Sequence, residues 1–480
     1  MAIFPALNDD CDARILERMP RSSLLALSKV SRAASIVVPP YIVRHLQISI
    51  TDSVEQRSIR SLCTQILSKN LAGRIKSVKI DYNPRVWPGD NPPSRNAPSS
   101  VDPVADVLAK ATSLRSISLI HFLLSDFLTS RRGIFLSLST LPSLTSLMLI
   151  NPGPGAFDAV ACLSQLQSIS WLYPSTKSDD IGPTFFTDLA RALNPSSSSL
   201  KEIIVYDEFP ETSTAVADFH PHVFPNVCSL TLRGVNTSTH QIAPQFPNLV
   251  AICGAEDLKC THSDAWPCLN SVDADWPVVV DFAQQHPLRH IYARWLGDCP
   301  RDDFFRFLNG IKHCPVKCLT LDICADAQYT PAWRLQLIAD GLPDLRCLNI
   351  DFDMPSDVPA DSVEKLFDLD ILRAFASFKN LRCLSLNLVR AVGAELYDDS
   401  SSIARRLLHA SGSVQYLKLK LCNRRSHSRA SYWIKISEKA GSESTSRDIS
   451  KEEFLEAEEK IRFEDGDPRV YSDVARYFPF

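Results

Sequence analysis

Three six-residue segments, VKCLTL (316–321), LRCLNI (345–350) and LRCLSL (381–386), share one pattern of apolar residues. An apolar first residue is followed by apolar residues three and five positions later. In an extended strand these two later positions face one side, whereas the residues two, four and six positions after the first face the other side. The pattern therefore predicts strands with one buried face. Ten more segments follow it, with only Gly254 breaking the apolar rule: IKSVKI (75–80), LRSISL (114–119), LTSLML (144–149), LQSISW (166–171), LKEIIV (200–205), VCSLTL (227–232), LVAICG (249–254), LNSVDA (269–274), LRHIYA (288–293) and VQYLKL (414–419).

The spacing of these segments identifies the kind of repeat. From Ile75 to Val414 there are 339 residues over 12 intervals, a mean of about 28 residues. Leucine-rich repeats carry the same L-x-x-L-x-L core and have repeats of roughly 20 to 29 residues. We therefore expect an α/β fold in which residues 75–422 form an irregular leucine-rich-repeat-like solenoid, with parallel strands inside and helices and loops outside.

Between the strands, helical periodicity predicts helices over 185–193, 302–313, 333–340, 362–375 and 403–409. From Leu249 to Leu288 the spacing falls to 20 and then 19 residues without a helical pattern, which predicts thin loops there. The proline- and serine-rich stretch 87–100 is expected to be a solvated loop.

Residues 423–480 form a charged C-terminal segment. It begins with an expected edge strand, SYWIKIS (431–437), and continues with the acidic run KEEFLEAEEKIRFEDGD (451–467). Such a run is most often a solvated helix or tail. The alternative is a docking or regulatory tail.

The N-terminal residues predict a hook of three short helices. Apolar residues recur at helical spacing over 7–19, where Pro20 closes the first helix, Ser22 and Ser23 are expected to cap the second, and a third spans 33–38. A unit this small has too little core to be comfortably stable alone, which suggests that it docks on something. The alternative is a helical cap that shields the first strand of the solenoid.

Residues 7–50 resemble an F-box, the module that binds the Skp-type adaptor of cullin-RING ubiquitin ligases. The stretch shows Leu7, Asp9, Ile15-Leu16, Met19-Pro20, Leu24-Leu25, Leu27 and Val30-Ser31-Arg32 in the family's order, and its end, YIVRHLQI (41–48), is similar to that of fungal F-box proteins with leucine-rich repeats. Asn8, Asp12, Ala33 and Ala34 depart from the family pattern. The resemblance implies an F-box-like domain over 1–50, followed by a connecting helix or cap over 51–74. It also implies the residues that form or support the adaptor contact: Leu7, Ile15, Leu16, Met19, Pro20, Leu24, Leu25, Leu27 and Val30.

The strand surface that faces away from the core is the expected site for a protein substrate, because solenoids bind partners on the face formed by their strands. Six positions after each first apolar residue the sequence has an apolar block, Ile120, Ile150, Leu172 and Tyr206, followed by a charged block. The alternative is that this position ends the strand and lies beneath the following loop. The candidate substrate-binding residues are Tyr206, Arg233, Asp275, His290, Tyr292, Arg294, Asp322 and Asp351.

Composition and motifs argue against several classes of function. A net charge of −4 with a pI near 6.3 provides no basic surface for nucleic acid. Nucleotide-binding and hydrolase motifs are absent, and 15 glycines leave little material for phosphate-binding loops. The spacing of Cys253, Cys260, His262 and Cys268 matches no zinc signature. We expect no cofactor and no metal.

Localisation follows from what the chain lacks. Its first residues do not resemble a signal peptide, and no stretch reaches the roughly 18 consecutive apolar residues of a membrane span. We therefore expect a cytoplasmic or nuclear protein with no membrane partner, in which the 14 cysteines are reduced. Cys318, Cys347 and Cys383, each two positions after a first apolar residue, are expected to form a ladder of small side chains.

Together these expectations indicate a non-enzymatic protein, the substrate-recognition subunit of an SCF-type cullin-RING E3 ubiquitin ligase. Its partners would be the Skp-type adaptor, through it a cullin scaffold, and an unknown protein substrate. Two alternatives remain open: a leucine-rich-repeat scaffold with a degenerate F-box and no ligase role, and an enzyme built on a repeat platform.

Overall fold

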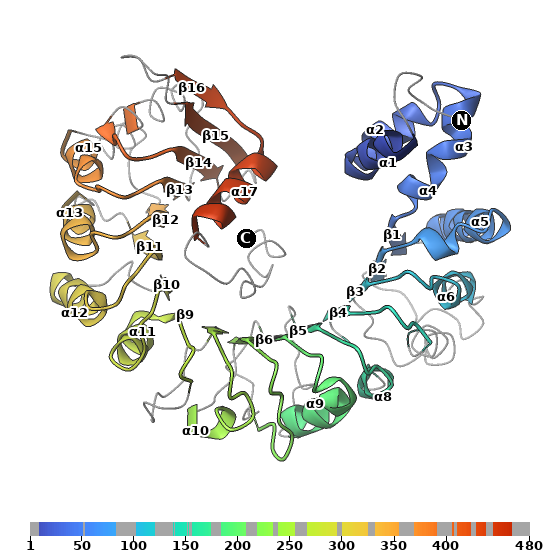
Figure 1. The fold of residues 1–480 in the computed structure, drawn as a ribbon, viewed down its shortest axis with the longest axis horizontal. Coiled ribbons are helices and arrows are strands. Elements are labelled where there is room, and N and C mark those ends of the chain that lie inside the picture. The colour runs from blue at the N-terminus through green and yellow to red at the C-terminus, as the bar shows by residue number, and fades with distance from the viewer. Residues whose placement is uncertain are drawn as a thin grey trace, which may run out of the picture. The chain divides into compact units, whose positions relative to one another are not determined.

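The structure is a computed structural model (Figure 1). It describes residues 9–50, 53–82, 102–120, 138, 140–150, 152, 156–173, 184–207, 218–233, 239–254, 266–294, 300–324, 332–354, 369–390, 406–407, 410–423, 429–437 and 445–462. The chain divides into two compact units. The first comprises residues 1–227, 231–236 and 244–247, and the second comprises 228–230, 237–243 and 248–480.

The first unit begins with the hook and continues into a run of strands and helices. The hook consists of α1 (Asp9–Arg18), α2 (Arg21–Leu27), α3 (Arg32–Val37) and α4 (Pro39–Ile42). The strands are β1 (His45–Ile50), β2 (Ser77–Tyr82), β3 (Ser116–Ile120), β4 (Ser146–Ile150), β5 (Ser168–Tyr173) and β6 (Glu202–Asp207). Between them lie α5 (Ser53–Ser68), η1 (Ala72–Arg74), α6 (Asp102–Ala109), α8 (Ala156–Ala161), α9 (Phe185–Leu193) and η3 (Asn194–Ser196).

The second unit has the same alternation. The residues of β7 (Ser229–Arg233) are divided between the units. The strands that follow are β8 (Ala251–Cys253), β9 (Ser271–Asp275), β10 (His290–Arg294), β11 (Cys318–Cys324), β12 (Cys347–Met354), β13 (Cys383–Arg390), β14 (Tyr416–Asn423), β15 (Arg429–Ser437) and β16 (Thr445–Asp448). The helices are α10 (Thr239–Ile242), α11 (Trp276–Ala283), α12 (Arg301–Ile311), α13 (Ala332–Gly341), α15 (Leu369–Ala376) and α17 (Lys451–Arg462).

The repeat predicted from the sequence is confirmed. Each of the thirteen segments coincides with one of the strands β2 to β14, and each strand begins two residues after the segment's first apolar residue. The first apolar residues are all buried, from Ile75 to Val414. Within each unit, neighbouring repeat strands pair in parallel and in register, as Ser77, Ser116 and Ser146 do on β2, β3 and β4. The fold is therefore an α/β leucine-rich-repeat-like solenoid.

The repeat also begins one strand earlier than the sequence analysis placed it. In β1 the buried residues Val43, Leu46 and Ile48 follow the same apolar spacing, and His45 pairs with Ser77 of β2. The segment 41–48, assigned to the end of the F-box-like domain, therefore supplies the first strand of the sheet. Helix α5 is then the helix of a first repeat.

Side chains in the turns before the strands connect successive repeats. Asn226 Nδ2 donates to the backbone oxygen of Ser198 at 2.6 Å, and Asn380 Nδ2 donates to that of Pro343 at 2.9 Å. Ser413 Oγ donates to the oxygen of Phe378 at 2.7 Å. These bonds satisfy carbonyl groups that the strands leave unpaired, and they hold each turn against the previous one.

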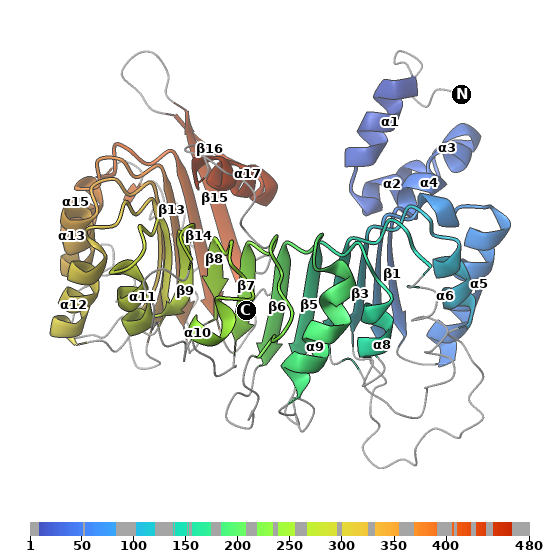
Figure 2. The same cartoon turned by 60° about the horizontal axis from the view of Figure 1, so that its bottom comes forward.

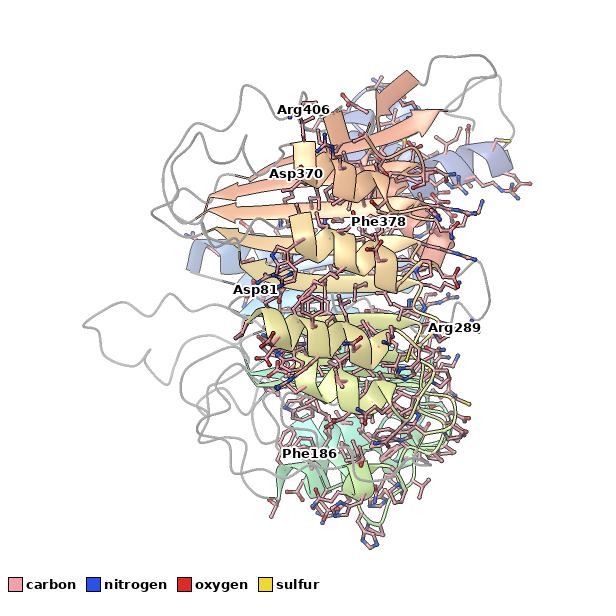
Figure 3. The ribbon with its side chains drawn as sticks, turned by 90° about the vertical axis from the view of Figure 1, so that its left-hand side faces the viewer. Asp81, Phe186, Arg289, Asp370, Phe378 and Arg406 are labelled. Carbon is pink, nitrogen blue, oxygen red and sulfur yellow. The ribbon has the colours of Figure 1, made fainter. Side chains whose placement is uncertain are left out.

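Helices α11, α12, α13 and α15 of the second unit lie on one face of its strands, and in Figures 1 and 2 α12, α13 and α15 form a layer beside them. Figure 3 views this layer from outside, with Asp370 in the first turn of α15 labelled. Helix α17 lies on the other face of the strands (Figure 1). The helices predicted over 185–193, 302–313 and 333–340 are confirmed as α9, α12 and α13.

Three predictions about the connecting segments have other outcomes. The thin loops predicted between 249 and 288 were wrong for the interval after β9, because α11 starts directly after that strand and buries Val279, Phe282 and Ala283. In the interval before β9, residues 255–265 lie outside the described residues. The helix predicted over 362–375 is present as α15 from Leu369, and residues 362–368 lie outside the described residues. Most of the helix predicted over 403–409 and the whole loop predicted over 87–100 also lie outside them. In the C-terminal segment the strand predicted over 431–437 is confirmed as β15, antiparallel to β14, but its predicted edge position was wrong because β16 pairs with part of it.

Candidate functional site

The hook has its own small core. Leu16 of α1, Leu24 of α2 and Ala34 of α3 pack together with Val38, and each is at most 4% exposed. Ser31 caps α3 by accepting a hydrogen bond from the backbone NH of Ala34 at 3.1 Å. The caps predicted for α2 were wrong, because that helix begins at Arg21 after Pro20, ahead of both serines. Three short helices around one core confirm the predicted hook, and α4 adds a further turn.

The hook also exposes apolar side chains. Ile15 is 38% exposed, Leu25 42%, Ile36 71% and Val30 75%. Among the large hydrophobic residues of the described ranges only two others are exposed, Val223 and Leu369. Apolar surface gathered on one small element of a protein is typical of an interaction site.

The residues that resemblance assigns to the adaptor contact therefore separate into two groups. Leu16 and Leu24 are buried in the hook core, and Met19 and Leu27 pack against it in part. These four support the hook's fold. The exposed residues are Ile15, Pro20, Leu25 and Val30, while Leu7 lies outside the described residues.

Sequence reasoning missed Ile36, which lies on α3 beyond the part of the F-box pattern that the resemblance used. Its signal was present, because Ala34 and Val38 mark the buried side of this short helix and Ile36 falls between them. Of the four departures from the family pattern, Ala34 is 1% exposed and Asp12 is 5% exposed, so both are buried in the hook, while Asn8 lies outside the described residues.

A charged contact joins the hook to the first strand. Arg44, which directly precedes β1, places Nη2 2.6 Å from Oε1 of Glu17 on α1. The same guanidinium lies 5.6 Å from the centre of the Tyr41 ring. The backbone oxygen of Arg44 accepts from the NH groups of Lys76 and Ser77, so the residue connects hook and sheet. The Arg44 guanidinium lowers the pKa of Glu17 below its usual value.

On the second unit, the strand face opposite the outer helices carries a row of side chains in register. His290, Cys318, Cys347, Cys383 and Tyr416 occupy matching positions on β10 to β14. We call these five residues the strand-face ladder. The predicted ladder of Cys318, Cys347 and Cys383 is confirmed, and the three side chains are at most 5% exposed.

Helix α17 covers this ladder. Phe454 and Ile461 of α17, with Ile449 just before it, form one buried cluster with the three cysteines, and Tyr416 and Leu455 pack against the cluster in part. The prediction of a solvated helix was therefore wrong for one side of α17. The alternative that was left open, a docking tail, describes the observed packing.

Beside the ladder lies a polar cluster from β8 to β11. Nε of Arg294 donates to Oδ1 of Asp273 at 2.8 Å, and the Cys253 thiol donates to Oδ2 of the same carboxylate at 2.8 Å. The Tyr292 hydroxyl donates to Oδ1 of Asp322 at 3.2 Å. Burial and the neighbouring Asp322 carboxylate raise the pKa of Tyr292, so it stays protonated and continues to donate.

The eight predicted substrate-binding residues are thus distributed over two places. Tyr206 and Arg233 belong to the first unit, where the guanidinium lies 5.1 Å from the ring centre. The other six lie on β9 to β12, and Asp275 is also the N-cap residue of α11. The prediction of an exposed apolar block was wrong for Ile120, Leu172 and Tyr206, because these side chains are buried. Substrate contact by any of the eight residues stays a prediction.

The described residues contain no group of three or more Cys, His, Asp or Glu side chains arranged to hold a metal ion. Most of the segment between Cys253 and Cys268 lies outside them. None of the described helices is long and apolar enough to cross a membrane.

Comparison with known proteins adds little. No family model matches the sequence, and no curated protein matches it. Among solved structures, the crystal structure of an internalin from Listeria monocytogenes is similar over 77% of this chain and 92% of that one, with 13% identity and a TM-score of 0.27. A likeness this low carries no argument, so the fold assignment rests on the register and burial described above.

Proposed function

We propose that this chain is the substrate-recognition subunit of an SCF-type cullin-RING E3 ubiquitin ligase, acting in the cytoplasm or nucleus. In this role the hook binds the Skp-type adaptor and the repeat region binds a protein substrate. The chain performs no chemistry itself, since catalysis belongs to other subunits of such a complex.

One observation supports the adaptor contact above all others. Four of the six exposed large hydrophobic side chains in the described residues belong to the hook, which spans only residues 9–42. Burying such a side chain in an interface contributes roughly 1.5 to 3 kcal/mol. A partner that covered several of them would gain enough to hold the hook, and the F-box resemblance names the partner.

The test uses the full-length chain and a purified Skp-type adaptor. Val30→Glu and Leu25→Glu place a charge on exposed hook positions without touching the hook core. Each should weaken adaptor binding at least about tenfold in a pull-down or calorimetric titration, the equivalent of about 1.4 kcal/mol. The matched control is Leu369→Glu on α15, because Leu369 is 67% exposed and lies in the second unit.

Two results would contradict the proposal. The unmutated chain could show no affinity for the adaptor, or the hook variants could bind as well as the Leu369→Glu control. Leu16→Asp and Leu24→Asp are unsuitable for this test, because both residues are in the hook core and their loss would unfold it.

A second function is favoured by a different observation. The hook leads through α4 and the Glu17–Arg44 pair directly into β1, which is where a repeat fold needs a cap. The chain would then be a leucine-rich-repeat interaction scaffold, with the hook as a cap and no ligase role. Stable folding of the chain together with no adaptor binding would favour this function.

A further inference from the structure

The sequence around α17 specifies a helix with one apolar side. Ser450 caps it by accepting a hydrogen bond from the NH of Glu453 at 3.1 Å, the spacing of a capping box. Ile449 before the cap and Phe454 in the first turn pack in the same cluster, as a hydrophobic staple does. Phe454, Glu458 and Ile461 then recur at helical spacing on the side that faces the strands.

The residues on the opposite side of α17 are charged and exposed. Glu452, Glu456, Glu459 and Lys460 all face solvent. Only Phe454 and Ile461 of the 12 residues in the helix are buried. The helix is therefore held by a narrow apolar stripe, which is the way an amphipathic peptide binds in a groove.

A polar contact sets the position of the helix on the strands. Nδ2 of Asn349, on β12, donates to Oε1 of Glu458 at 3.2 Å. The Glu458 carboxylate also attracts the Lys418 ammonium of β14, which opposes the lowering of the Lys418 pKa by burial. Arg462 pairs with Glu458 at 2.5 Å within the helix and lies close enough to His290 to help lower its pKa. The carboxylate at position 458 thus accepts a hydrogen bond from β12 and is attracted by a positive charge on β14.

The spacing of the helix matches the spacing of the strands. Phe454 and Ile461 are seven residues apart, about 10.5 Å along a helix that rises 1.5 Å per residue. Cys318 and Cys383 are on strands two steps apart, about 9.6 Å at 4.8 Å per step. The small thiols of the ladder leave room for a helix on the strands, and Phe454 and Ile461 both pack in one cluster with the three cysteines.

We propose that the strand face of β11 to β14 is a binding site for an acidic amphipathic helix, and that α17 occupies it as an internal competitor. The partner carries an aromatic or aliphatic residue, a carboxylate four positions later and an aliphatic residue seven positions later. Its helix displaces α17 and takes the same contacts with the cysteines, Asn349 and Lys418. Because this site does not involve the hook, it is independent of adaptor binding.

A peptide of residues 448–462, DISKEEFLEAEEKIR, labelled with fluorescein, serves as the probe of the site. The full-length Phe454→Glu variant, whose own helix is weakened, should bind it at least about tenfold more tightly than the unmutated chain does in fluorescence anisotropy. The matched control is Lys460→Glu, which places the same new side chain on the exposed side of α17 and should behave as the unmutated chain. A peptide that itself carries Phe454→Glu should not bind.

Thiol alkylation provides a second readout in the same proteins. Cys347 and Cys383 should react with iodoacetamide in Phe454→Glu, stay protected in Lys460→Glu, and become protected again when the peptide is added. Cys63, fully buried in α5 of the first unit, must stay unreacted in every sample and so reports that the chain is folded. Exposed Cys11 reports that the reagent is active.

If Phe454→Glu proves unfolded, with Cys63 reactive, the unmutated chain still tests the proposal. Saturating peptide should then increase hydrogen exchange at the backbone amides of residues 451–462. The proposal is overturned if folded Phe454→Glu fails to bind the peptide, or if its cysteines remain protected. It is equally overturned if the peptide leaves exchange in α17 of the unmutated chain unchanged.

Discussion

Two carboxyl groups on the strand face have raised pKa values, and the register of the sheet explains why. Asp322 on β11 pairs directly with Asp351 on β12, so two carboxylates of like charge stand side by side. Burial, together with the charge of Asp351, raises the pKa of Asp322 to about 6. Asp351 is partly buried, which raises its pKa, and the hydrogen bond from Asn387 limits that rise.

The raised pKa of Asp322 predicts a dependence of stability on pH. The pKa of Asp322 is about 6 in the folded chain and 3.8 in the unfolded chain, so the folded chain binds this proton more tightly. The contribution of this proton to the free energy of unfolding is therefore complete below pH 3.8 and is lost as the pH rises through about 6. Asp322→Asn removes the charge and keeps an acceptor for Tyr292. The variant should therefore be more stable than the unmutated chain at pH 8, by about 1 to 3 kcal/mol, and nearly equal to it below pH 4.

Urea unfolding at pH 4, 6 and 8 measures this difference. The control is Asp302→Asn, an exposed carboxylate in the first turn of α12, for which no comparable gain at pH 8 is expected. An equal or lower urea midpoint for Asp322→Asn at pH 8 would show that the carboxylate is not destabilised by its neighbours.

Individual elements depend on close approaches between adjacent repeats. A Cβ atom placed on Gly310 of α12 would lie 2.6 Å from Cγ1 of Val280 on α11. No such clash exists at Gly341, the last residue of α13, where nothing lies within 4 Å of the added atom.

These two glycines predict opposite effects of one substitution. Gly310→Ala should destabilise the chain by about 1 to 3 kcal/mol, because the helices must move apart despite alanine's better helix propensity. Gly341→Ala should be neutral or stabilise it by up to about 1 kcal/mol. Thermal unfolding of the two variants side by side checks the pair, and a stabilised Gly310→Ala would mean that α11 and α12 do not approach this closely.

How far the elements could be predicted depends on whether their signal was local. The strands were predicted because each contains its own apolar spacing. Helix α9 matched its predicted bounds because six of its nine residues are buried and give a clear helical periodicity. Helix α11, WPVVVDFA, was missed because its apolar residues run together without periodicity, and short consecutive apolar runs do not separate helix from strand.

The candidate sites show where local reasoning ends. The Ser450–Glu453 capping box and the Ile449–Phe454 pair were visible in the sequence and predict a helix with a buried side. The surface it covers was not visible, since Cys318, Cys347 and Cys383 come from strands far earlier in the chain. For the hook, both sides of α1 and α2 carry leucine or isoleucine, so only packing separates Leu16 and Leu24 from Ile15 and Leu25.

At the scale of the whole molecule, a repeat fold must cover the last strand of its sheet. An exposed edge strand presents unpaired NH and CO groups that pair readily with another chain. Here the parallel order stops at β14, and β15 pairs with it in antiparallel fashion from Tyr416 to Cys422. Strand β16 then covers part of β15. The C-terminal segment therefore covers both the edge of the sheet, through β15 and β16, and the strand face, through α17.

Removing this segment should make the chain associate with itself. A chain ending at residue 423 leaves the eight-residue strand β14 without a neighbour on one side. We expect it to form dimers or larger species whose mass rises with concentration, measured by size exclusion with light scattering. The full-length Phe454→Glu variant is the control, because it releases α17 from the strand face while β15 still covers the edge. It should remain a monomer.

Two results would contradict this prediction. If the truncated chain is also monomeric at every concentration, β14 does not need its antiparallel neighbour. If both proteins associate, the effect comes from the uncovered strand face.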